Sequence, residues 1–224
     1  MFTALMLGSG VFWTLTYLLI IRQGARDHTY GMPLVALCAN LSWEFIFAFL
    51  HPHEPIQRTV NMVWFAFDVV ILLQLLRYGP YEFSDLPRVV FYAGFGLTLV
   101  TSFCLVLLLS YEFNDWAGAY AAFGQNLLMS VLFLLMLYRR RSLRGQSLSI
   151  GLCKLIGTAL ASLAFYLYVE SFRQSVLLPF LYGAILVYDG LYVGLVYVRL
   201  HAERQERRVS TTDGEPLAPP AVSS

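Results

Sequence analysis

The chain has 224 residues, of which 58% are hydrophobic and 13% charged, and its formal net charge is +1. Soluble domains are roughly 45–50% apolar and about 25% charged, and a soluble protein of this length could not bury so much apolar surface. The composition therefore excludes a cytosolic enzyme, a nucleic-acid-binding protein and a disordered scaffold, and it indicates an integral membrane protein. Cys38, Cys104 and Cys153 all lie in apolar stretches, which argues against a disulfide framework.

Apolar stretches recur along the chain at lengths suited to membrane spans, since a bilayer core of roughly 30 Å needs about 20 apolar residues in a helix. In chain order, we predict spans near residues 2–21, 31–50, 60–76, 89–109, 117–138, 148–168 and 177–198. The sequence thus predicts an all-α fold, a polytopic bundle of seven transmembrane helices over residues 1–200. The polar residues 201–224 are predicted to form a disordered cytoplasmic tail.

Positive charges alternate between the predicted loops. The 1–2, 3–4 and 5–6 loops and the tail hold two, two, four and four Lys or Arg residues, whereas the other loops hold one, none and one. Because Lys and Arg are enriched in cytoplasmic loops, this pattern predicts an N-terminus outside and a C-terminus in the cytoplasm. The single lysine, Lys154, falls one to two turns inside the sixth span, and we interpret it as a side chain that reaches back to the cytoplasmic face.

Three acidic residues fall inside predicted spans: Glu44 in the second, Asp68 in the third and Asp189 in the seventh. A charged carboxylate is costly in the bilayer, so such residues face the bundle interior and commonly mark a functional site. The structural alternative is that they pair with a buried cation or with a hydrogen-bond network. Lys154 is the only cation inside a span and cannot pair with all three, so we treat the three acids as candidate site residues.

Aromatic side chains share a helix face with each acid, by their spacing along the helices. The polar and aromatic residues on these faces include Asn40, Trp43, Trp64, Tyr182 and Tyr192. A carboxyl group in an apolar cavity can stay protonated near neutral pH, and aromatic rings stabilise a nearby cation by about 0.5–2 kcal/mol each. Such a cavity suits carbocation chemistry started by protonation of an alkene or epoxide, for which we expect no metal and no cofactor.

The segment Leu37–Phe45 (Leu-Cys-Ala-Asn-Leu-Ser-Trp-Glu-Phe), with Trp64–Asp68 and Tyr188-Asp189, resembles the small seven-helix membrane terpene cyclases. These enzymes act in fungal meroterpenoid and indole-diterpene pathways and have bacterial relatives in drimane-type indole alkaloid biosynthesis. The resemblance covers the membrane region, and Asn-x-x-Trp-Glu in the second span is its most specific element. It implies that Glu44 and Asp189 are the catalytic acids, one delivering the initiating proton and the other holding or replenishing it. The expected supporting residues are Asn40, Trp43, Trp64, Asp68, Tyr188 and Tyr192.

The resemblance also implies a lipophilic prenylated substrate, farnesylated and of indole type, that reaches the protein through the lipid bilayer. We expect no nucleic acid and no obligate protein partner. The short chain and loops are similar to the bacterial members, which implies a bacterial cytoplasmic membrane; a fungal protein would lie in the endoplasmic reticulum. The His51-Pro-His53-Glu54 loop is interpreted as a solvated loop rather than a metal site.

An alternative hypothesis assigns the same buried acids to a different function. A proton-coupled carrier of small molecules would need carboxyl groups inside the membrane as proton relays. The two hypotheses are distinguished by chemistry, because a carrier moves its solute in proteoliposomes without changing it.

Overall fold

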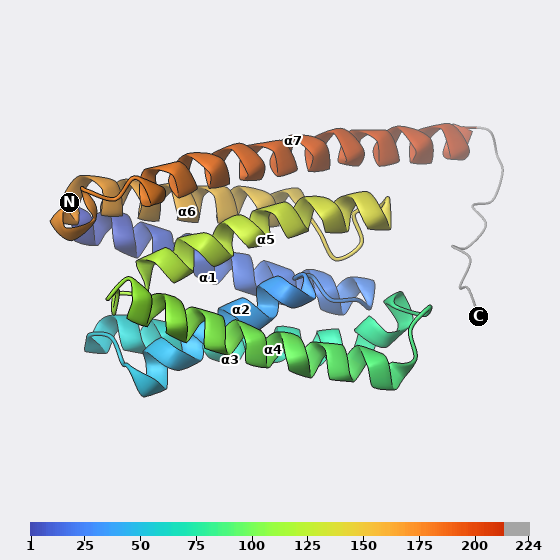
Figure 1. The fold of residues 1–224 in the computed structure, drawn as a ribbon. Helices are drawn as coiled ribbons and strands as arrows, with labels where there is room; N and C mark the ends of the chain where they lie inside the picture. The colour runs from blue at the N-terminus through green and yellow to red at the C-terminus, as the bar shows by residue number, and fades with distance from the viewer. Residues whose placement is uncertain (213–224) are drawn as a thin grey trace.

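The structure, a computed structural model, describes residues 1–212 and consists of long helices laid side by side (Figure 1). The helices are, in chain order, α1 (Phe2–Asp27), α2 (Leu34–Phe45), a π-helical turn η1 (Ile46–Leu50), α3 (Pro55–Glu82), α4 (Arg88–Glu112), α5 (Ala119–Arg140), α6 (Leu148–Tyr168), a short 3-10 turn η2 (Glu170–Phe172) and α7 (Leu177–Thr212). Residues 1–212 form no β-strand. The predicted all-α bundle of seven helices is therefore confirmed.

Six of these helices are long and apolar enough to cross a membrane, and only α2, even with η1, is shorter. The outer surface carries exposed apolar side chains, as a surface in contact with lipid requires, among them Leu73, Val89, Leu97 and Val187. The protein is an integral, multi-pass membrane protein. Helix α3 runs well beyond the predicted span near 60–76, because hydropathy marks only the apolar middle of a helix whose polar ends continue the same hydrogen bonding.

Local sequence explains where several helices begin. Pro55 is the first residue of α3, and Pro33 and Pro87 directly precede α2 and α4. Proline suits these positions because its fixed φ matches the helix and its missing N–H would have no partner in the first turn. The Ser147 hydroxyl caps α6 by accepting a hydrogen bond from the Ile150 amide at 3.3 Å.

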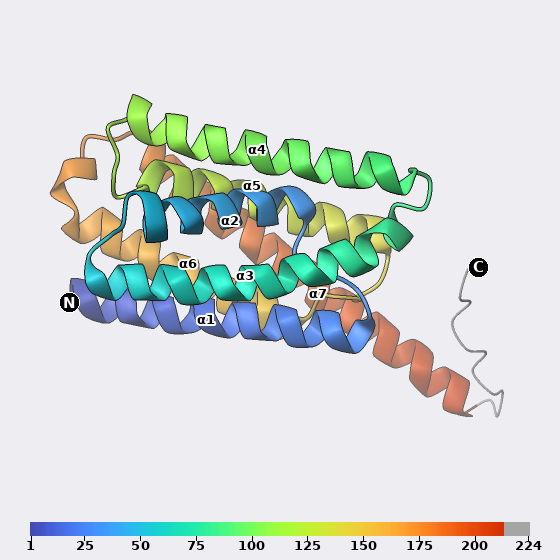
Figure 2. The same ribbon diagram turned by 90° about the horizontal axis from the view of Figure 1, so that it is seen from below.

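Helix α2 lies at the centre of the bundle, with α3, α4 and α5 packed against it (Figure 2). Every residue from Ala36 to Glu44 is buried, which is the pattern of a helix covered on all sides. Helix α1 packs along α6, while α7 packs on α5 and α6. Side chains on α2 are therefore held from several directions at once.

The N-terminus and the far end of α7 lie at opposite ends of the bundle (Figures 1 and 2). Helix α7 continues to Thr212, so it includes residues 201–212 of the predicted tail. Ala202, Glu203 and Arg204 are good helix formers and extend the helix beyond its apolar part. The remaining residues of the predicted tail, 213–224, lie outside the described residues.

Candidate active site

Glu44 lies near the end of α2 in the bundle interior, with 1% of its surface exposed. The Tyr17 hydroxyl on α1 donates a hydrogen bond to Glu44 Oε1 at 2.5 Å. Asn40, one turn earlier on α2, has its Nδ2 3.4 Å from the same oxygen and also donates to the Tyr17 hydroxyl. Two helices thus fix the position of this carboxyl group.

Asp68 on α3 is fully buried and belongs to the same network. Its Oδ2 accepts a hydrogen bond from Asn40 Nδ2 at 3.0 Å, so a single amide nitrogen lies within hydrogen-bond distance of both carboxyl groups. Gln125 on α5 donates to Asn40 Oδ1 at 3.1 Å and orients that amide. None of the ion pairs within residues 1–205 includes Glu44 or Asp68.

This network has more acceptors than donors. Glu44 Oε2, Asp68 Oδ1 and Gln125 Oε1 are buried and form no hydrogen bond with any described residue. Buried polar atoms usually have a partner, and a protonated carboxyl group supplies a donor that a carboxylate lacks. The arrangement can therefore hold a proton, or receive a ligand that donates hydrogen bonds, among α2, α3 and α5.

Trp43 lies on α2 with Asn40 and Glu44 but contacts a different part of the bundle. Its Nε1 donates to the Gly118 carbonyl at 2.9 Å, and its ring lies 5.0 Å from Phe47 in a separate apolar cluster. Gly118 has φ +67°, and a Cβ there would lie 2.5 Å from the Phe47 ring. Trp43 thus holds the start of α5 against α2, and the structure does not bring it to the carboxyl network.

Trp64 on α3 lies next to the network. Its ring is 6.0 Å from that of Tyr17, and its Nε1 donates to the Thr14 hydroxyl at 3.1 Å. The Phe67 ring lies 6.2 Å from Tyr17 as well. Aromatic rings therefore surround the phenol that donates to Glu44.

The structure contradicts the interpretation of Lys154 as a side chain that reaches back to the cytoplasmic face. It is 1% exposed and does not reach the cytoplasmic face. Its Nζ lies 2.7 and 2.9 Å from the two carboxylate oxygens of Asp189 and donates to the Ser130 hydroxyl at 2.7 Å. The side chain points inward because α6 turns this residue towards α5 and α7, where a buried anion compensates its charge.

The two aromatic residues predicted beside Asp189 have different surroundings. Tyr192 is 1% exposed, packs at 5.4 Å from the Phe133 ring, and its hydroxyl has no partner among the described residues. Tyr188 is 38% exposed, and no hydrogen bond or aromatic contact of the described residues brings it to the site. Residues 188 and 189 are neighbours in sequence, but consecutive helical residues point about 100° apart, in line with 3.6 residues per turn.

Glu44 and Asp189 thus belong to two polar clusters, and no hydrogen bond or ion pair of the described residues joins them directly. Trp13 on α1 lies between the clusters. Its ring is 6.2 Å from Tyr17, and Lys154 Nζ lies 5.9 Å from its centroid. An indole ring therefore separates the Tyr17–Glu44 pair from the Lys154–Asp189 pair.

The amino-acid sequence matches a known family. A family model for Pyr4-like transmembrane terpene cyclases matches residues 1–203. The chain belongs to this family. The cyclase is 34% identical over 165 residues to the Pyr4-family terpene cyclase mfmH of Annulohypoxylon moriforme, covering 72% of this chain and 68% of mfmH. It is 31% identical to terpene cyclase penB of Penicillium crustosum (85% and 82% covered) and 29% identical to terpene cyclase ascF of Acremonium egyptiacum (93% and 84%).

These relatives bear on two expectations. They are terpene cyclases, which supports an enzyme of terpenoid biosynthesis over a proton-coupled carrier. They are also fungal proteins, so the expected bacterial cytoplasmic membrane has no support. No solved structure matches the cyclase.

Two residues of the carboxyl network have no signal in the sequence. Tyr17 lies in a continuous apolar helix and Gln125 in a helix without acids, so neither forms a local motif with Glu44. Lys154 did carry a signal, since it is the only lysine and lies within a span. The sequence allowed Lys154 to pair with one of the three acids. It could not show that the partner is Asp189, because that depends on how α6 and α7 are rotated relative to each other.

The His51–Glu54 loop is exposed except at His53, which is half-buried. The His53 ring stacks on Phe47 at 4.6 Å, and its Nδ1 lies 3.2 Å from Asn61 Nδ2. Burial lowers the pKa of His53, and burial raises the pKa of Asp115 in the α4–α5 loop, where its Oδ2 caps α5 at the Tyr120 amide. Within the described residues, no three His, Cys, Asp or Glu side chains are grouped in a way that could hold a metal ion.

Proposed function

We propose that this membrane terpene cyclase starts its reaction by transferring a proton from Glu44 to a terminal alkene or epoxide of a prenylated substrate. The proton leaves the carboxyl group and binds the terminal alkene carbon or the epoxide oxygen. The carbocation that forms is attacked by the next alkene, which closes a carbon–carbon bond, and loss of a proton from the last cation restores neutrality. The product is then an isomer of the substrate.

The observation that carries this proposal is the pair of carboxyl groups that share the Asn40 amide without a cation. Two carboxylates so close in an apolar interior repel each other strongly. The arrangement is favourable when one of them holds a proton, which is what a general acid requires. Each carboxyl group has one buried oxygen without a partner among the described residues, and we assign the proton to Glu44, which both Asn40 and Tyr17 orient.

The aromatic surroundings support the same assignment. Tyr17 packs between Trp64 and Phe67, at ring distances of 6.0 and 6.2 Å. Such rings stabilise positive charge without quenching it as water would, each by about 0.5–2 kcal/mol. We propose that they accompany the cationic chain during ring closure.

Asp189 is assigned a supporting role rather than the initiating one. Both of its oxygens are bound to the Lys154 ammonium at 2.7 and 2.9 Å. A carboxylate held in this way is an anion and has no proton to donate. We propose that Asp189 balances the charge of Lys154 and fixes α7 against α6.

We also propose a substrate class and a membrane for the protein. We propose a farnesylated, indole-type substrate that dissolves in the bilayer, because the bundle surface offers no aqueous domain within residues 1–212. The Arg-rich α5–α6 loop lies at the end of the bundle opposite the N-terminus. With fungal relatives, this favours the endoplasmic reticulum membrane, with the N-terminus in the lumen and the C-terminus in the cytosol.

The test compares microsomes carrying wild type, Glu44→Gln and Glu112→Gln, each supplied with farnesylated indoles and their terminal epoxides in deuterated buffer. Glu112 is an exposed residue at the end of α4 and is the matched control. From the alkene substrates we expect wild type and Glu112→Gln to give an isomeric cyclic product with one deuterium bound to carbon. From the epoxides we expect an isomeric cyclic alcohol whose deuterium, bound to oxygen, exchanges with solvent. For Glu44→Gln we expect a rate lower by on the order of 10²–10⁴-fold, the usual contribution of a general acid. Full turnover by Glu44→Gln would disprove the assignment.

A further inference from the structure

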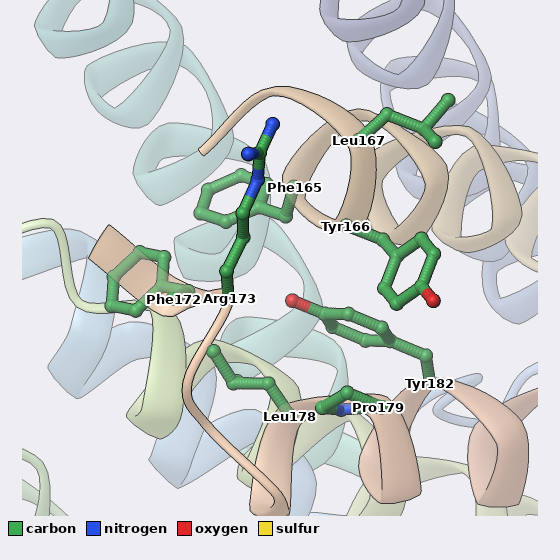
Figure 3. Close-up of a pocket in the computed structure, with 8 residues that line it drawn as sticks. All are labelled: Phe165, Tyr166, Leu167, Phe172, Arg173, Leu178, Pro179 and Tyr182. Atoms are coloured by element: carbon green, nitrogen blue, oxygen red, sulfur yellow. The ribbon is translucent and has the colours of Figure 1, made fainter. Parts of the chain in front are cut away.

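Two cavities lie side by side between α6 and α7. One has a volume of about 400 Å³ and is lined by residues of both helices and the connecting segment (Figure 3). The other has about 430 Å³ and extends along the two helices as far as Asp189. Both are lined by Tyr166, Pro179 and Tyr182, so they form one continuous groove, which we call the α6–α7 groove.

The deep half of the α6–α7 groove is apolar with a polar floor. Leu155, Leu163 and Leu186 form much of its walls. Thr158, Ser162 and Asp189 provide the polar atoms, and the Ser162 hydroxyl is buried without a partner among the described residues. Asp189 is itself 2% exposed and ion-paired with Lys154, so a buried, charged group borders this half of the groove.

The other half has a different chemistry. The Tyr182 ring lies across it, with Tyr166 from α6 on one side and Arg173 and Phe172 from the connecting segment on the other (Figure 3). Arg173 is largely exposed at this end. A guanidinium and two phenols suit a polar aromatic ring, because Arg and Tyr stack on such rings and donate hydrogen bonds to them.

We propose that the α6–α7 groove binds the amphipathic prenylated substrate as it enters sideways from the bilayer. The prenyl chain occupies the deep half towards Ser162 and Asp189, and the polar aromatic ring stays between Tyr166, Tyr182 and Arg173. The volume of each cavity falls within the roughly 300–1,000 Å³ that is usual for small-molecule sites. A substrate with an apolar chain and a polar aromatic ring at one end matches the largely apolar half and the half with Arg173, Tyr166 and Tyr182.

The inference rests on the proposed function, because Glu44 is enclosed and needs a route from the lipid. The α6–α7 groove ends at Asp189, whose partner Lys154 lies against Trp13. Trp13 in turn lies against Tyr17, the donor to Glu44. Lys154 and Trp13 therefore lie between the end of the groove and the carboxyl network.

The chain offers a matched pair of glycines for the test. Gly183 lines the α6–α7 groove and Gly194 lies outside it, on the same helix. Both are exposed, and a Cβ added at either position meets no atom within 4 Å. Leucine at 183 therefore fills the groove, whereas leucine at 194 gives the same gain in helix propensity without filling it.

The probe is a farnesylated indole with a diazirine in its prenyl chain, irradiated with the full-length protein in phosphatidylcholine vesicles. We expect labelled peptides from α6 and α7, labelling reduced at least tenfold in Gly183→Leu, and wild-type labelling in Gly194→Leu. In turnover assays, Gly183→Leu should raise KM at least tenfold with little change in kcat. Equal labelling in Gly183→Leu and wild type, or labelling confined to other helices, would overturn the proposal.

Two further experiments distinguish a failure of the groove proposal from a failure of the proposed catalytic acid. A diazirine-bearing phosphatidylcholine that labels the α6–α7 groove and is not displaced by excess farnesylated indole would show a lipid site and overturn the proposal. Glu44→Gln should lose turnover and keep the groove labelling. If Glu44→Gln keeps turnover, the proposed acid is wrong while the groove assignment is still decided by the labelling.

Discussion

Lys154 and Asp189 form a buried ion pair between α6 and α7, with Nζ 2.7 and 2.9 Å from the two carboxylate oxygens. Each side chain is 2% exposed, and Ser130 supplies a third contact to the ammonium. Removing one partner of such a pair leaves an uncompensated charge, whereas replacing both with apolar residues is often tolerated. The effects on stability of replacing Lys154 and Asp189 should therefore not be additive.

Asp189→Asn should lower the free energy of unfolding by about 3–5 kcal/mol, because Lys154 keeps its charge in an apolar interior. Thermal unfolding of the detergent-solubilised protein measures this change. The double variant Lys154→Met/Asp189→Leu should recover at least half of the loss. Glu170→Gln, which breaks the exposed pair with Arg173, is the control and should change stability by less than about 0.5 kcal/mol. Equal melting temperatures for Asp189→Asn and wild type would contradict the pairing.

Tyr17→Phe should reduce kcat at least tenfold while leaving KM within about threefold of wild type, because the phenol orients Glu44 rather than binding the prenyl chain. The ring stays in place, so the packing with Trp64 and Phe67 is kept. Steady-state turnover in microsomes gives both constants. Tyr138→Phe, at an exposed phenol, is the control and should match wild type. An unchanged kcat for Tyr17→Phe would remove the hydroxyl from the mechanism.

Gly118→Ala should destabilise the protein by about 1–3 kcal/mol, since a methyl group at φ +67° is strained and would lie 2.5 Å from Phe47. Gly124→Ala, inside α5, meets no atom within 4 Å and should stabilise the protein by up to about 1 kcal/mol. Comparing the two melting temperatures isolates the strain at the start of α5. Equal effects of the two substitutions would contradict it.

His53 should make stability depend on pH. Its burial lowers its pKa below the ordinary 6.5, so the unfolded chain takes up a proton before the folded chain does. The free energy of unfolding therefore falls as the pH drops below about 6.5. Asp115 acts in the opposite sense, because its raised pKa makes the folded state bind a proton first as the pH falls.

His53→Phe separates the two groups, because it keeps an aromatic ring at Phe47 and removes the histidine titration together with the contact to Asn61. Melting temperatures between pH 5 and 7.5 should fall less steeply for His53→Phe than for wild type. His201→Phe changes an exposed histidine and should keep the wild-type slope. The prediction fails if the wild-type and His53→Phe curves are parallel.

The sequence predicted the helices and the polar face of α2 well, for a physical reason. Hydropathy and helical period are local properties, and they placed Asn40 and Glu44 on one face and Asp68 inside a span. The sequence also predicted that the acids face the bundle interior, because acids avoid lipid. The structure adds that both carboxyl groups contact the same amide.

Contacts between distant helices could not be predicted, since they depend on helix rotation. Lys154 turns inward to Asp189, Trp43 turns towards Gly118, and Tyr188 faces outward. Tyr17 joins Glu44 across 27 residues without a motif that marks it. These rotations are set by side-chain packing between whole helices, which a single sequence does not specify locally.

The contact between Gln125 and Asn40 joins residues 85 positions apart. At roughly 5–20 residues per second of synthesis, about 4–17 s pass between the emergence of the two residues from the ribosome. During that interval α2 must enter the membrane with an acid and an amide that lack their final neighbours. Early assembly of α1 and α2, with Tyr17 meeting Glu44, shortens the exposure of these groups to lipid. Biogenesis of the cyclase should therefore be more sensitive than its finished fold to changes in the first two helices.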